Sequence, residues 1–223
     1  MKALIKVIIT LALVFATTFV IAKLTGILSF EQIEAWLIQA KQVSHLKLML
    51  LIVVVLFADL FIAIPVLSIC MLSGYLLGAV LGFAASITGI LLVGVVGYLL
   101  SQKYGELILK RLVKSETERK QMKSLFNQYG FSLIIMSRAT PILPEVSACL
   151  AGMSKMPFLK FLLAWTLVNI PYAAIANYSG SISSIENPKP AILTAVAIVF
   201  VFSTSWLWFQ HKVKRQNQIS NTN

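Results

Sequence analysis

Charged residues, histidine and cysteine are all scarce in this chain of 223 residues. Asp and Glu together number 8, His and Cys number 2 each, and charged residues make up 12% of the total. His45 and His211 lie near opposite ends of the chain, and Cys70 and Cys149 fall in apolar segments. These residues lack the spacing of a metal site, a disulfide framework or a nucleophile with its base. We therefore expect no metal, no cofactor and no catalytic residues, so an enzyme is not predicted.

Apolar residues dominate what remains, at 58% of the chain. They form long runs that are suited to helices within a bilayer, each of which needs about 20 apolar residues. The net charge of +11 comes from basic residues that lie between and after these runs. Such a distribution is typical of topology signals rather than of a nucleic-acid surface, so no nucleic-acid partner is expected. The composition predicts an all-α integral membrane protein.

The segment 131–152 is apolar overall, yet it carries Arg138, Pro141, Pro144 and Glu145 in its middle. A straight transmembrane helix would place two charges in hydrocarbon and lose backbone hydrogen bonds at two prolines. We interpret it as a re-entrant hairpin, a helix that enters the membrane, breaks and returns on the same side. Charges at membrane depth usually mark a functional site. The alternative is an interfacial segment that leaves Arg138 among lipid head groups.

A second segment, 46–67, has a similar layout. Asp59 precedes Pro65 by six positions, as Arg138 precedes Pro144. Because a membrane span is expected after each segment, the pattern predicts an inverted repeat of two re-entrant helical hairpins, each followed by a transmembrane helix.

The predicted spans are residues 83–100 and 158–178. Within the second span Asn169 lies two positions before Pro171. An asparagine there can either satisfy the backbone groups that the proline frees or line a path through the membrane.

Small residues recur every four positions at Gly74, Gly78 and Gly82, and they predict a helix face that another helix approaches closely. We interpret this stripe as intramolecular packing, with a homo-oligomer contact as the alternative.

The chain divides into four parts. Residues 1–45 hold a retained N-terminal anchor, rather than a cleaved signal peptide, and an interfacial amphipathic helix at 29–42. The other parts are the membrane domain 46–181, a last transmembrane helix within 182–209 and a polar tail at 210–223.

The basic residues orient these parts. If both hairpins return to the membrane face that they entered, 15 of the 19 Lys and Arg residues lie on one side of the membrane. The exceptions are Lys23, Lys41, Lys47 and Lys189. The positive-inside rule then places both termini in the cytoplasm, and the compact size and the lack of an organelle targeting signal favour a bacterial inner membrane. The basic segment 101–128 is interpreted either as a solvated connector or as a surface for anionic lipids.

From Arg138 onwards, the arginine, Pro141, Pro144 and the pair Gly152 and Met153 resemble the VTT-domain superfamily, which includes the DedA and SNARE-associated Golgi proteins. The resemblance covers about 46–181. DedA proteins carry a Pro-x-Pro-Gly-Glu tip in the first hairpin, whereas this chain has only Pro65 there. The sequence is therefore more similar to the Golgi-vesicle-protein branch.

This resemblance implies lipid translocation, of polyprenyl phosphates or of phospholipids. The hypothesis is a flippase or scramblase that binds anionic lipid head groups and needs no cofactor. Its candidate substrate-binding residues are Arg138, Pro141, Pro144, Glu145, Asp59 and Asn169. A non-transporting membrane scaffold and a small-anion transporter remain alternatives.

Overall fold

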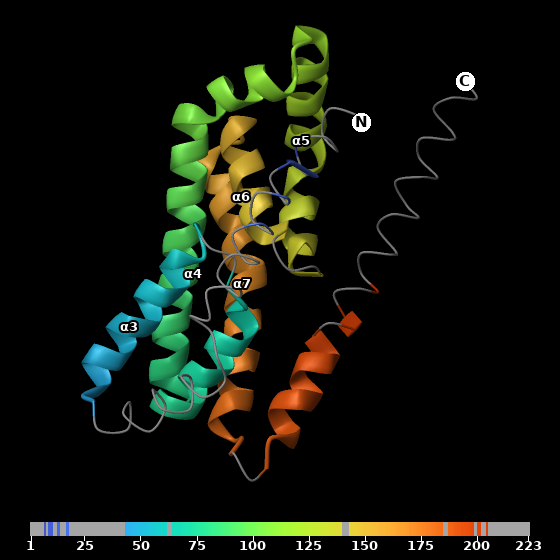
Figure 1. The fold of residues 1–223 in the computed structure, drawn as a ribbon. Helices are drawn as coiled ribbons and strands as arrows, with labels where there is room; N and C mark the ends of the chain where they lie inside the picture. The colour runs from blue at the N-terminus through green and yellow to red at the C-terminus, as the bar shows by residue number, and fades with distance from the viewer. Residues whose placement is uncertain are drawn as a thin grey trace.

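The computed structural model describes residues 43–61, 64–139, 143–184 and 187–198, together with positions 7, 9, 10, 13, 17, 200, 201 and 204. The predicted amphipathic helix at 29–42 and the polar tail at 210–223 lie outside these residues, as does most of the predicted anchor. Every regular element in the described part of the chain is a helix (Figure 1), which confirms the all-α prediction.

The first half of the fold begins with α3 (His45–Ala58) and continues into α4 (Val66–Leu112). The break between them follows from local chemistry. A carboxylate oxygen of Asp59 accepts a hydrogen bond from the backbone N–H of Ile64 at 2.7 Å, which folds the chain back at the end of α3. Pro65 then precedes α4, where its missing N–H costs no helical hydrogen bond.

The long helix α4 is bent sharply at Gly78. This residue has φ 79° and ψ 171°, a backbone conformation that is open to glycine and strained for other residues. The hydroxyl of Ser73 donates to the carbonyl of Gly82 at 3.1 Å across the bend. Residues 66–77, the short arm of α4, therefore turn back beside the start of residues 79–112, the long arm (Figure 1). We call α3 and the short arm the first hairpin.

The second half contains a second helical hairpin, formed by α5 (Glu116–Met136), the short 3-10 helix η1 (Ser137–Ala139) and α6 (Leu143–Met153). Arg119 fixes the turn before it by donating from Nη1 to two backbone carbonyls, each at 2.8 Å. The hydroxyl of Ser137 donates to the carbonyl of Ile134 at 2.6 Å where α5 ends. Pro144 lies in the first turn of α6, where a proline is tolerated.

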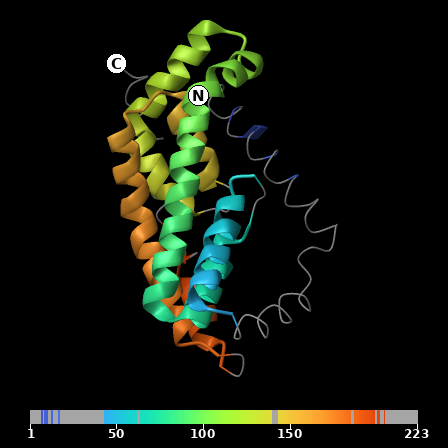
Figure 2. The same cartoon turned by 90° about the vertical axis from the view of Figure 1, so that its left-hand side faces the viewer.

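The helix α7 (Phe158–Ser181) crosses the whole fold and runs beside the long arm of α4 (Figure 1). Seen from the side, α4 lies between α3 and α7 (Figure 2). Tyr98 of the long arm stacks on Phe161 of α7 with ring centroids 4.8 Å apart. A further short apolar helix, Lys189–Ile198, follows α7.

Each hairpin packs closely against the long helix of the other half. A Cβ atom added at Gly74, in the short arm of α4, would lie 2.8 Å from the Cα of Asn177 in α7. One added at Gly152, in α6, would lie 2.8 Å from the backbone nitrogen of Gln102 in the long arm of α4 and would also overlap the carbonyl of Tyr98. The predicted intramolecular packing is present at Gly74 and at Gly82, where an added Cβ would lie 2.7 Å from Oδ1 of Asn177, but nothing lies within 4 Å of one added at Gly78. The prediction that these glycines form one continuous helix face is wrong, because Gly78 makes a bend.

Candidate functional site

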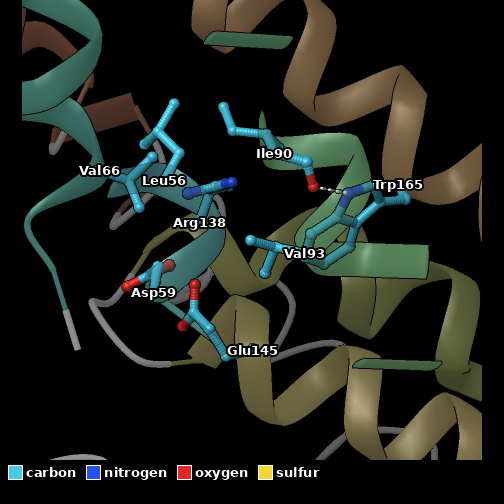
Figure 3. Close-up of a pocket in the computed structure, with 8 residues that line it drawn as sticks. All are labelled: Leu56, Asp59, Val66, Ile90, Val93, Arg138, Glu145 and Trp165. Atoms are coloured by element: carbon cyan, nitrogen blue, oxygen red, sulfur yellow. Dashed lines mark hydrogen bonds between the residues drawn. The ribbon is translucent and has the colours of Figure 1, made fainter. Parts of the chain in front are cut away.

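The tips of the two hairpins meet beside α7 and enclose a small cavity (Figure 3). The first tip contributes Asp59, and the second contributes Arg138 of η1 and Glu145 of α6. Apolar side chains of α3 and α4 and the indole ring of α7 complete the lining: Leu56, Val66, Ile90, Val93 and Trp165. The cavity measures about 10 Å³, the lower limit for one water molecule. A phosphate group therefore needs a movement of the tips to enter it.

Arg138 is held by α7. Its Nε donates a hydrogen bond to Oδ1 of Asn169 at 2.8 Å, and its Nη2 donates to the same oxygen. The guanidinium carbon lies 4.6 Å from the centroid of the Tyr172 ring and 6.0 Å from that of Trp165. Such contacts use the planar shape of a guanidinium group, which a lysine does not share.

The three residues that hold Arg138 share one face of α7, because Trp165, Asn169 and Tyr172 follow one another at intervals of four and three positions. The indole N–H of Trp165 donates to the carbonyl of Ile90 at 3.1 Å, which fixes the ring against α4. Asn169 has no exposed surface, and its Nδ2 donates to the carbonyl of Trp165 at 2.8 Å. This bond orients the amide so that its oxygen faces Arg138.

Two buried carboxyl groups lie beside this arginine. Asp59 is 3% exposed and Glu145 is 5% exposed, and their side chains lie close together in the cavity (Figure 3). Glu145 lies in the first turn of α6, where the helix dipole favours a negative charge. In the described part of the chain, no group of three or more His, Cys, Asp or Glu residues could hold a metal ion.

Arg138 is not ion-paired with either acid. Within the described residues, ion pairs with a nitrogen–oxygen distance of 4.0 Å or less join Lys120 to Glu116 and Lys123 to Glu106, and neither involves Arg138. The site thus holds one cation on an amide oxygen and an aromatic face, with two acids close by.

The structure brings together four of the six predicted site residues: Asp59, Arg138, Glu145 and Asn169. Pro144 is buried at the start of α6 and helps to break the helix rather than to line the cavity. Pro141 lies outside the described residues.

Sequence reasoning missed the part that Trp165 and Tyr172 play in holding the arginine. The available signal was the placement of two aromatic residues four positions before and three positions after a buried polar residue in an apolar helix. That spacing predicts a shared face, but it does not indicate that Arg138 lies against it.

Two described helices, Val66–Arg111 and Phe158–Ser181, are long and apolar enough to cross a membrane. The family model for the VTT domain matches residues 64–182, just over half of the chain, including both of these helices and the second hairpin. Comparison with curated proteins and with solved structures found no match. The chain therefore belongs to the VTT-domain family, within the DedA and SNARE-associated Golgi protein superfamily, and is an integral membrane protein.

Proposed function

We propose that this protein is a flippase- or scramblase-like lipid translocase, which moves an anionic lipid such as undecaprenyl phosphate or a phospholipid between leaflets. The observation that carries the proposal is the position of Arg138, where two broken helices meet and where it forms no ion pair with the described residues. A cation at membrane depth costs about 2.5–3.5 kcal/mol on insertion scales. A lipid phosphate that binds there offsets this cost.

The residues of the site take distinct parts in this proposal. The guanidinium of Arg138 binds phosphate oxygens through paired hydrogen bonds. The first turn of α6, which begins beside Pro144, adds backbone N–H donors and a favourable helix dipole. Asp59 and Glu145 balance the positive charge or link transport to a cation, and Pro144 helps to break the second hairpin at its tip. The partners are membrane lipids, and no catalytic step or cofactor is needed.

The proposal treats both hairpins as re-entrant elements that enter from opposite membrane faces. Two observations support an inverted repeat. First, equal intervals along the chain separate three pairs of residues: Asp59 and Arg138, Pro65 and Pro144, and Tyr98 and Asn177. Second, Gly74 packs on Asn177 while Gly152 packs on Tyr98, so each hairpin makes the equivalent contact with the span of the other half.

This arrangement also orients the protein. The basic connector between α4 and α5 and both termini lie in the cytoplasm, in accordance with the positive-inside rule. We propose a bacterial inner membrane as the location. The absence of a second proline and of a Gly-Glu pair after Pro65 favours the Golgi-vesicle-protein branch over the DedA proteins proper.

The direct experiment measures leaflet exchange of a fluorescent phospholipid and of a polyprenyl phosphate in proteoliposomes. We expect exchange by the wild type and its loss in Arg138→Ala, because the phosphate then has no cation. Arg138→Lys should also lose most of the activity, since an ammonium lacks the planar pair of donors. Arg111→Ala is the matched control, because Arg111 is exposed at the end of α4, away from the cavity.

Wild-type exchange rates in Arg138→Ala would remove the proposal. A scaffold that uses Arg138 only to balance the acids makes a different prediction. For a scaffold, exchanging the charges in a double variant, Asp59→Arg with Arg138→Asp, should restore function. For a translocase it should not, because the displaced arginine loses its contacts with Asn169 and Tyr172.

A further inference from the structure

Arg138 has two competing sets of partners within one cavity. On one side are the amide oxygen of Asn169 and the ring of Tyr172, both on α7. On the other side are the carboxyl groups of Asp59 and Glu145, which belong to the two hairpin tips. The structure has the arginine on the α7 side, within hydrogen-bonding distance of Asn169 and outside an ion pair with either acid.

This choice of partner needs a cause, because an arginine beside carboxylates in a low-dielectric site is strongly drawn towards them. Asn169 supplies that cause. Its amide is fully buried, and its nitrogen donates a hydrogen bond to the carbonyl of Trp165, so the position of its oxygen is fixed by α7 itself. Two guanidinium nitrogens donate to that one oxygen, and the Tyr172 ring covers the guanidinium plane.

An arginine that pairs with the acids would be neutralised, and a lipid phosphate would then have to break that pair. An arginine that rests on a neutral amide keeps its full charge. We infer that Asn169, assisted by the ring of Tyr172, is a positioning residue that holds Arg138 away from Asp59 and Glu145 and so keeps its charge available to a phosphate head group. This inference rests on the proposed function, since it concerns the same arginine and the same ligand.

The first test measures equilibrium binding of a short-chain phosphatidic acid to the full-length protein in lipid nanodiscs, with the matching diacylglycerol as a phosphate-free control. Asn169→Leu keeps the branched shape of the side chain but removes the acceptor, so binding should weaken by about tenfold or more, as expected for a hydrogen bond to a charged group. Adding Glu145→Gln to that variant should restore most of the loss, because one of the competing acids is neutral. A merely structural role for Asn169 predicts no such rescue.

Asn177→Leu is the matched control. Asn177 is also fully buried on α7, and its nitrogen donates to the carbonyl of Ala173 at 2.8 Å in the same way, but its oxygen accepts from Ser86 instead of Arg138. This variant should lower the melting temperature. Adding Glu145→Gln to it should not restore any loss of phosphatidic acid binding. Tyr172 provides a second route if Asn169→Leu does not fold: Tyr172→Leu removes the ring that covers the guanidinium group, so it should bind phosphatidic acid more weakly than the wild type does.

The second test observes Arg138 directly and needs no lipid. The chain has four arginines, so the Nε–H signal of Arg138 in nitrogen-15-labelled protein is assigned by its loss in Arg138→Lys. We expect that signal to shift in Asn169→Leu and to remain in place in Asn177→Leu. An unmoved signal in Asn169→Leu, unchanged binding in that variant, or a loss of binding that Glu145→Gln fails to restore would each overturn the inference. If the signal shifts in Asn169→Leu but the wild-type protein exchanges no lipid, the result counts against the proposed function and not against this inference.

Discussion

Gly152 offers the sharpest test of how the second hairpin is held. A Cβ atom at this position would meet the carbonyl of Tyr98 and lie 2.8 Å from the backbone nitrogen of Gln102, so both obstacles are backbone atoms that no rotamer change can move. Overpacking of this kind costs about 1–3 kcal/mol. Alanine gains about 1 kcal/mol over glycine in a helix, which offsets part of the cost. We expect Gly152→Ala to be destabilised by up to about 2 kcal/mol, which corresponds to a melting temperature lower by up to about 8 °C for a chain of this size.

Gly97→Ala is the control for this prediction. Its added Cβ would lie 3.0 Å from Cδ1 of Leu60, the end of a flexible side chain, and 3.9 Å from the Cβ of Ala148. Its melting temperature should match or exceed that of the wild type, since the helix gain outweighs a small side-chain movement. Melting in detergent can be followed with a thiol-reactive dye, because unfolding exposes the buried Cys70. If Gly152→Ala melts no lower than Gly97→Ala, the close approach of α6 to the long arm of α4 is incorrect.

Two further predictions use the same melting assay. Gly78→Ala should be destabilised by about 1–3 kcal/mol through backbone strain alone, because its φ is 79° and nothing lies within 4 Å of an added Cβ; an unchanged melting temperature would argue against the bend in α4. Lys120→Gln should leave the melting temperature at pH 7 unchanged, since its ion pair with Glu116 is exposed. Lys120 lowers the pKa of Glu116, so any stabilisation by the pair is present at neutral pH and is lost as the pH falls through that lowered pKa. A large drop in the melting temperature of Lys120→Gln at pH 7 would contradict the prediction that this exposed pair contributes little.

Local signals in the sequence predicted where the helices break. Pro65 and Pro144 do begin new helices, and Asp59 and Arg138 do lie at the ends of the preceding ones. These features could be predicted because a proline or a charge in an apolar run acts on its own few neighbours in the chain.

The remaining features depend on contacts that no local pattern specifies. Gly78 was interpreted as part of a packing stripe, because a glycine in an apolar run can serve either close packing or a positive φ. The bond between Arg138 and Asn169 joins residues on different elements, so it depends on where the second hairpin lies against α7. Spacing along the chain predicts which side chains share a face, but it does not predict which distant element that face contacts.

The same interval along the chain also relates residues that surround the cavity. These pairs explain why the groups that hold Arg138 lie on one side of the site. The interval between Asp59 and Arg138 also separates three further pairs around the site: Val66 and Glu145, Ile90 and Asn169, and Val93 and Tyr172. In each of these three pairs the member from the first half is aliphatic and the member from the second half has a polar group. Equivalent charges of the same sign would repel one another where the tips meet, and Asp59 and Arg138 avoid this by having opposite signs. The amide and the ring that hold Arg138 come from the second half, because their counterparts in the first half, Ile90 and Val93, are aliphatic. If the protein translocates lipids as we propose, this asymmetry places one phosphate on the side of α7 and leaves the aliphatic wall of the first half to contact the apolar part of the lipid.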